Sequence, residues 1–301
     1  MTPHVAFGAS SFLAAATNFA VLGNAAVTNV GATSVTGDLG IWPGTSVTGL
    51  GTIVLTGALH VNDATAQQAQ LDATAAYNTL ILMPFTQDLT GQDLGTLGPL
   101  TPGVYQFDSS AQLTGSLVLD AQNNPNALFV FQIGTALTTA TAASVQVING
   151  GANTGVYWQL GSSATLGTAT IFAGNILAHD SITLITSASI TCGRAIALNA
   201  AVTLGTNVIS NDCGSSITRN DFGSSGFSGF AVPTPEPGTY ALMGFALAGL
   251  VGFRRVLNRK CCKCETPSSW RALLSRPVAA TCSCLWTRRS TCGANAGCCS
   301  K

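Results

Sequence analysis

A Thr-Leu-x-Thr pattern recurs at intervals of 18 to 20 residues, and it is the feature that most constrains the fold. The pattern occupies 165–168, 183–186 and 203–206. Each copy has a short apolar run before and after it, which gives three short strands per repeat. Stacked repeats of this kind predict a mainly β solenoid of roughly triangular section. Five leucines mark the repeat at spacings of 18 to 29 residues: Leu113, Leu137, Leu166, Leu184 and Leu204.

The directions of the side chains follow from these leucines, because neighbours in a strand point to opposite faces. If each leucine points inward, so does the residue two before it, and only Thr135 is polar in that set. The residue just before each leucine then points outward: Gln112, Ala136, Thr165, Thr183 and Thr203. The outward positions on either side are also uncharged. Those before the central position are Ser110, Gly134, Ser163, Ser181 and Ala201, and those after it are Thr114, Thr138, Gly167, Ile185 and Gly205.

Strands in a stack lie about 4.8 Å apart, so this column would present one hydroxyl and one methyl group per strand. Such an array can order water without a nearby charge to disturb it. The alternative is that threonine simply suits strands. A solvated strand face would, however, normally carry Lys and Glu, and both are absent throughout residues 1–230.

Residues 62–82 interrupt the strand pattern. Small or apolar residues recur there at helical spacing, and Asn62 or Asp63 can cap the start. We therefore predict an amphipathic helix that lies along one face of the solenoid. Residues 18–41 look like a further coil, so the helix interrupts the solenoid rather than following it. The contact positions of the helix are Ala66, Ala69, Ala73, Tyr77 and Leu80.

Charge divides the chain near residue 230. Residues 1–230 contain ten aspartates and two arginines, a formal charge of −8, whereas residues 231–301 carry +8. The acidic part lacks basic patches, which argues against a nucleic-acid partner. Its two cysteines, Cys192 and Cys213, form either one disulfide or two buried thiols. The disulfide is favoured, because residues one coil apart have Cα atoms about 5 Å apart.

The sequence gives little indication of catalysis. Its histidines are His4, His60 and His179, and none has metal-ligand spacing. His179 and Asp180 fall on a turn, where a solvated pair is favoured over a catalytic dyad. The aspartates are spread along the chain, whereas solenoid lyases and hydrolases need clustered groups. We predict no cofactor and no metal, and we rank an enzyme third among the functions.

Several ordered segments carry a specific resemblance: "NFAVLG", "VTGDLGI", "HVNDATAQQAQLDATAAYN", "LTPGVYQF", "VYWQLGSSATLGTATIFAGNILA", "SITL" and "GRAIALNAAVTLGTNVIS". Together, over residues 18–211, they resemble the microbial ice-binding protein family. The resemblance implies a discontinuous right-handed β-solenoid with a long helix alongside and one flat face that adsorbs to ice. This chain departs from the pattern at Gln112, Ala136 and Ile185, so we expect ice binding of moderate strength. The implied ice-face positions are Thr165, Thr168, Thr183, Thr186, Thr203 and Thr206.

A second resemblance lies near the C-terminus. Pro235-Glu236-Pro237, an apolar run and the pair Arg254-Arg255 are similar to the Pro-Glu-Pro sorting signal (PEP-CTERM) of Gram-negative bacteria. The resemblance implies export, transient membrane insertion through 239–257, cleavage by an exosortase and release or surface attachment. An ordinary tail anchor is the alternative.

The expected organisation is therefore a series of segments. The N-terminal segment (1–17) is followed by an ice-binding solenoid (18–213), a Gly/Ser linker (214–232), the sorting signal (233–260) and a basic cysteine-rich tail (261–301). We expect a signal peptide to be absent or to lie upstream of Met1. We expect the tail to be disordered or a reading-frame artefact. We predict an exported, monomeric, non-enzymatic protein that binds ice. The rival function is a surface adhesin or matrix protein that uses the solenoid as a spacer.

Overall fold

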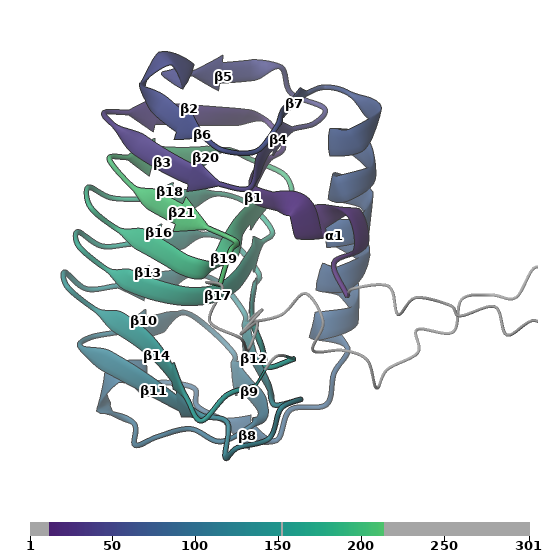
Figure 1. Ribbon diagram of the computed structural model, residues 1–301. Helices are drawn as coiled ribbons and strands as arrows, with labels where there is room; N and C mark the ends of the chain where they lie inside the picture. Colours follow the sequence, from purple (N-terminus) through teal and green to yellow (C-terminus); the bar gives the residue numbers. More distant parts are fainter. Residues whose placement is uncertain (1–11, 152, 214–301) are drawn as a thin grey trace, which may run out of the picture. The chain divides into compact units, whose positions relative to one another are not determined.

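The computed structural model describes residues 12–151 and 153–213. In this part of the chain, parallel strands wind into stacked coils, and one helix runs beside the stack (Figure 1). A seven-stranded sheet forms one side, which we call the threonine face. Its strands, in spatial order, are β10 (Ala111–Leu113), β13 (Leu137–Thr139), β16 (Ala164–Leu166), β18 (Ile182–Leu184), β20 (Val202–Gly205), β2 (Ala26–Val30) and β5 (Ser46–Thr48).

A fourteen-stranded sheet forms the other two sides. One side, the second face, contains β11 (Ser116–Asp120), β14 (Ser144–Ile148), the first parts of β17 (Ile171–Ala178) and β19 (Ser189–Ala197), β21 (Val208–Ser210), β3 (Thr33–Thr36) and β6 (Ile53–Leu55). The other side, the helix face, contains β8 (Gln87–Asp88), β9 (Gly103–Phe107), β12 (Leu128–Ile133), β15 (Gly155–Leu160), the later parts of β17 and β19, β1 (Phe19–Gly23), β4 (Asp38–Ile41) and β7 (Leu59–Val61).

β17 and β19 turn from the second face to the helix face within a single strand. Their pairing register shifts between Ala173 and Gly174. Gly174 has a φ of 102° and Cys192, in β19, has a φ of 57°. A bulge of this kind bends a strand sharply, so these residues make a corner of the coil.

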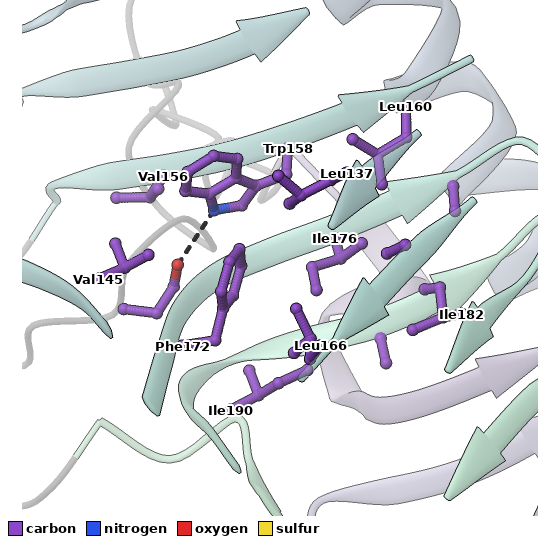
Figure 2. Packing of buried hydrophobic residues seen from close by; sticks show 14 of the residues in the cluster. Leu137, Val145, Val156, Trp158, Leu160, Leu166, Phe172, Ile176, Ile182 and Ile190 are labelled. Carbon is purple, nitrogen blue, oxygen red and sulfur yellow. Dashed lines mark hydrogen bonds between the residues drawn. The ribbon is translucent and has the colours of Figure 1, made fainter. Parts of the chain in front are cut away.

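Apolar side chains from all three sides fill the interior. The largest group is an aromatic stack in which Tyr105, Phe131 and Trp158 occupy paired positions of β9, β12 and β15. The rings of Phe131 and Trp158 lie 4.0 Å apart and nearly parallel. Trp158 Nε1 donates a hydrogen bond of 3.1 Å to Ala173 O, which satisfies the indole inside the core (Figure 2). The alternating pattern of the strands thus becomes one continuous core.

The N-terminal coils stack on the last coil of the solenoid. β1 pairs with β19, β2 with β20 and β3 with β21. Arg194, which is buried, donates from Nε and Nη2 to Thr17 O and from Nη1 to Asn175 Oδ1. The stack is therefore continuous in space although the chain that builds it is discontinuous.

Helix α1 (Ala64–Ile81) returns the chain from one end of the stack to the other. It lies within the predicted 62–82, and Asp63 is its cap, since Asp63 Oδ1 accepts a hydrogen bond of 2.8 Å from Ala66 N. Eighteen residues span about 27 Å, which is close to the depth of six stacked strands. All the predicted contact residues are buried, and their small side chains let the helix lie close to the sheet: Ala66, Ala69, Ala73, Tyr77 and Leu80.

Three short 3₁₀ helices complete the described elements: η1 (Ala14–Asn18), η2 (Leu50–Thr52) and η3 (Leu94–Thr96). Cys192 and Cys213 form a disulfide with Cα atoms 4.5 Å apart. Between Phe12 and Cys213, no helix is both long enough and apolar enough to cross a membrane. The predicted membrane segment, 239–257, lies outside the described residues.

Candidate functional site

One outward side chain from each strand builds a central column on the threonine face. In β16, β18 and β20 a half-buried threonine stands between two buried residues, so Thr165, Thr183 and Thr203 point outward. Register pairing then extends the column in both directions. In spatial order it reads Gln112, Thr138, Thr165, Thr183, Thr203, Thr28 and Thr48. At about 4.8 Å per strand, its uninterrupted threonines cover roughly 24 Å.

The coil that contains Leu137 differs from its predicted register. We expected Leu137 to align with the other repeat leucines, but the structure pairs it with Ala111 and Ala164. The outward residue of this coil is therefore Thr138, and the predicted gap in the column at Ala136 was wrong. A shift of two residues keeps every side chain on its own face, so the hydrophobic pattern cannot distinguish the two registers.

Two threonines of the column, Thr28 and Thr48, were missed by the sequence analysis. Neither coil has a leucine at the repeat position. Asn29 occupies it after Thr28 and pairs with Leu204, and Gly49 follows Thr48. Asn29 is tolerated inside because its side-chain amide is hydrogen-bonded. Nδ2 donates to Gly31 O and Thr52 Oγ1, and Oδ1 accepts from Thr33 Oγ1. A signal was present, however: Asn-Ala-Ala-Val-Thr occurs at 24–28 and again at 199–203.

A second column of threonines follows the edge between the threonine face and the second face. Backbone hydrogen bonds join successive corners there: Thr168 O accepts from Ala142 N, Thr186 O from Ala169 N and Thr206 O from Ser187 N. The column consists of Thr141, Thr168, Thr186 and Thr206, and all four are exposed. Thr141 was not predicted, because the misplaced register hid its position three residues after Thr138.

The positions flanking the central column are small, hydroxylated or aliphatic. Ser163 and Ser181, both predicted, lie on adjacent strands with hydroxyl oxygens 3.1 Å apart. Thr114 lies at the Gln112 end of the face, and Gln112 Nε2 donates to its hydroxyl oxygen. Ile185 is 40% exposed on the other flank. Thr135, which we predicted to point inward, is exposed.

No charged side chain points outward from the seven strands of the threonine face. The first charge along the stack is Asp93, which pairs with Gln112 at the end of the column. Burial raises the pKa of Asp93, but hydrogen bonds from Thr114 and Gly95 N more than offset this and hold the pKa below its usual value. The threonine face therefore meets a charged group at the end where the column loses its threonines.

His179 and Asp180, the pair weighed as a catalytic dyad, lie at a solvent-exposed corner. His179 Nδ1 lies 2.8 Å from Asp180 Oδ1, but both side chains are about half exposed on a corner of the coil. This hydrogen bond lowers the pKa of Asp180. Within residues 12–213, position 152 aside, no three His, Cys, Asp or Glu side chains are placed to hold a metal. A pocket of about 230 Å³ lies near the C-terminal end of α1 and is lined by Gln106, Gln132 and Gln159 among others.

Comparison with known proteins identifies the architecture. The sequence model of the family described as "Ice-binding-like" matches residues 21–210. The chain belongs to this ice-binding family. Its sequence is 54% identical to the ice-binding protein of Nostoc sp. (strain HG1) over 203 residues, which are 67% of this chain and 75% of that protein.

Solved structures of ice-binding proteins share the fold. The ice-binding protein from an Antarctic biological consortium is 41% identical, with a TM-score of 0.63 over 70% of this chain and 95% of the other. The protein from the ascomycete Antarctomyces psychrotrophicus is 38% identical, with a TM-score of 0.62 over 67% and 98%. The mainly β fold with parallel strands and one helix is therefore that of the ice-binding family.

This ice-binding family member also carries a second recognisable segment. A model described as "PEP-CTERM protein-sorting motif" matches residues 233–256. That range contains the predicted signal residues, all of which lie outside the described part of the chain: Pro235, Glu236, Pro237, Arg254 and Arg255.

Proposed function

We propose that this protein adsorbs to ice through the threonine face and so inhibits ice growth and recrystallisation. The observation that carries the proposal is the central column of Thr138, Thr165, Thr183, Thr203, Thr28 and Thr48. Each strand adds one hydroxyl that can hydrogen-bond an ordered water and one methyl that prefers an ordered water cage. The regular strand spacing keeps these groups in a fixed array.

The corner threonines and the flanking serines would widen this surface. Thr168, Thr186 and Thr206 run beside the central column, as do Ser163 and Ser181. The absence of charge matters because a charged group would bind its own hydration shell and prevent the water above it from joining a lattice. We assign no reaction to the protein.

Thermal hysteresis and inhibition of ice recrystallisation test the proposal. Thr183→Tyr inserts a large ring into the middle of the central column and leaves runs of two and three threonines. The longest run falls from about 24 Å to about 10 Å, so we expect both activities to be lost while the fold is retained. Ser189→Tyr is the matched control, because it adds the same ring to the second face of the same coil. If the wild-type protein shows neither activity, the proposed function is wrong.

The sorting motif supports export followed by C-terminal processing. In this view residues 1–17 precede the solenoid (18–213), a linker (214–232) leads to the signal (233–260), and residues 239–257 enter the membrane until an exosortase cleaves the chain. The mature protein would be a monomer, released or attached at the cell surface. Mass spectrometry of the native protein tests this, because a C-terminus at Lys301 would contradict processing.

A further inference from the structure

The last described residue, Cys213, lies at the corner opposite the threonine face. Each coil enters the threonine face at one corner and leaves it at a second, which are residues 179–181 and 185–188 in the coil that contains β18. Cys192 occupies the third corner, where β19 bends from the second face to the helix face. Cys213 is held to this corner by the disulfide. Cys213 itself therefore lies away from the threonine face.

The last coil is also the seam of the solenoid. β20 and β21 follow one another directly before Cys213, and they hold the N-terminal strands β2 and β3. β21 is only three residues long. A pull on the tail would break its hydrogen bonds one at a time, because the free end of a short terminal strand opens first. β20 would follow, and the column would separate between Thr183 and Thr28.

The disulfide changes the path of such a pull. The bond joins Cys213 to Cys192 across 21 residues of sequence, and this loop contains both β20 and β21. Force applied to the tail therefore enters the stack at Cys192. That residue is nearly buried in β19, which is hydrogen-bonded to β17 and to β1. The two strands of the seam then carry none of the load.

We infer that this protein holds a surface to ice while it is pulled through its C-terminal tail. The sorting motif at 233–256 follows Cys213 and supplies the attachment, so the partner is the cell envelope on one side and ice on the other. The inference rests on the proposed function. A freely diffusing ice-binding protein carries no load, so its disulfide would contribute only the usual restriction of the unfolded chain.

Bead adhesion to ice under flow tests the inference. The full chain is produced with a biotin acceptor peptide at either its N-terminus or its C-terminus and is coupled to streptavidin beads. The measurement is the shear stress that detaches half of the beads from ice. For the variant Cys192→Ser/Cys213→Ser we expect this stress to fall several-fold with C-terminal coupling and to stay unchanged with N-terminal coupling. The N-terminal arm is the matched control, because its load does not pass through Cys213.

The possible outcomes separate this inference from simpler explanations. An equal loss in both couplings would show that the disulfide only stabilises the fold, and no loss in either would show that the seam withstands load without it. Both results overturn the inference. Failure of the free wild-type protein to inhibit recrystallisation would instead overturn the proposed function.

A nicked chain provides a second measurement if the double variant does not fold. A protease site is placed at Asn199, which is exposed and lies inside the disulfide loop. After cleavage the tail is still joined to Cys192, so C-terminally coupled beads should keep the detachment stress of the uncut chain. A large drop on cleavage would mean that the load runs through the last coil, which contradicts the inference.

Discussion

Asn207 holds the corner where the last coil turns from the threonine face to the second face, and Asn207→Ala tests how strongly this corner supports the seam. Its side chain is 2% exposed. Nδ2 donates hydrogen bonds of 2.9 Å to Ile185 O and to Ala188 O, and Oδ1 accepts one from Gly205 N. Its backbone N–H donates to Thr33 Oγ1 and is unaffected by the change.

The expected loss follows from these three hydrogen bonds. Each contributes roughly 1 kcal/mol net, so Asn207→Ala should lower the free energy of unfolding by about 3 kcal/mol. In a domain of this size that corresponds to a fall in Tm of about 6–12 °C. The backbone groups left behind are enclosed by the corner, so water cannot easily replace the lost amide.

Differential scanning calorimetry measures the effect, and Asn199→Ala is the matched control. Asn199 Nδ2 donates one hydrogen bond of 2.9 Å, to His179 O, but its side chain is exposed. Water can satisfy that carbonyl, so the control should change Tm by no more than about 2 °C. Equal Tm values for the two variants would refute the reasoning, because burial would then not distinguish the two corners.

Three further predictions concern the ladder, the helix and pH. Thr28→Tyr leaves a longest run of four threonines in the central column, whereas Thr48→Tyr leaves a run of five. Thermal hysteresis should therefore fall more for Thr28→Tyr. Equal thermal hysteresis for the two variants would contradict a continuous column. Ala73→Leu forces a larger side chain between α1 and the sheet and should cost about 1–3 kcal/mol in chemical denaturation, whereas exposed Ala75→Leu should cost almost nothing. A backbone N–H in the first helical turn holds the pKa of Asp63 below its usual value. The stability from this cap is therefore present above the unfolded-state pKa of about 3.9 and is lost as pH falls through the folded pKa. Tm should therefore stay level from about pH 8 to 5 and drop below about pH 4. Ice activity should not vary between about pH 8 and 5, because the strands of the threonine face carry no titrating side chain. A Tm that stays level down to about pH 2 would contradict the role of the Asp63 cap.

The repeat in the sequence was sufficient to predict the architecture. Alternation around Leu166, Leu184 and Leu204 placed three threonines on the outside, and the structure has them in one column. The alanine spacing of 66, 69 and 73 predicted the helix and its contact side. These features are local, since they depend on periods of two and 3.6 residues that any short segment displays.

Register was harder to predict than direction. The coil of Leu137 can be aligned with its neighbours in two registers that differ by two residues. Both registers keep the alternation of inward and outward side chains, and both bury apolar residues. Only the contacts with neighbouring coils select one of them, because Leu137 must pack beside Ala111 and Ala164. That choice adds Thr138 to the column and changes an interrupted ladder into a longer one.

The sequence by itself determined the repeating coil, the inward leucines, the uncharged outward threonines and the helix that covers one side. The tertiary structure alone decided how long the column is and where it is continuous. Thr28 and Thr203 are far apart in the chain, yet they are neighbours because the N-terminal coils stack on β20 and β21. The physical reason is that the open strand edges of the last coil must find hydrogen-bonding partners, and the coil of residues 19–36 supplies them.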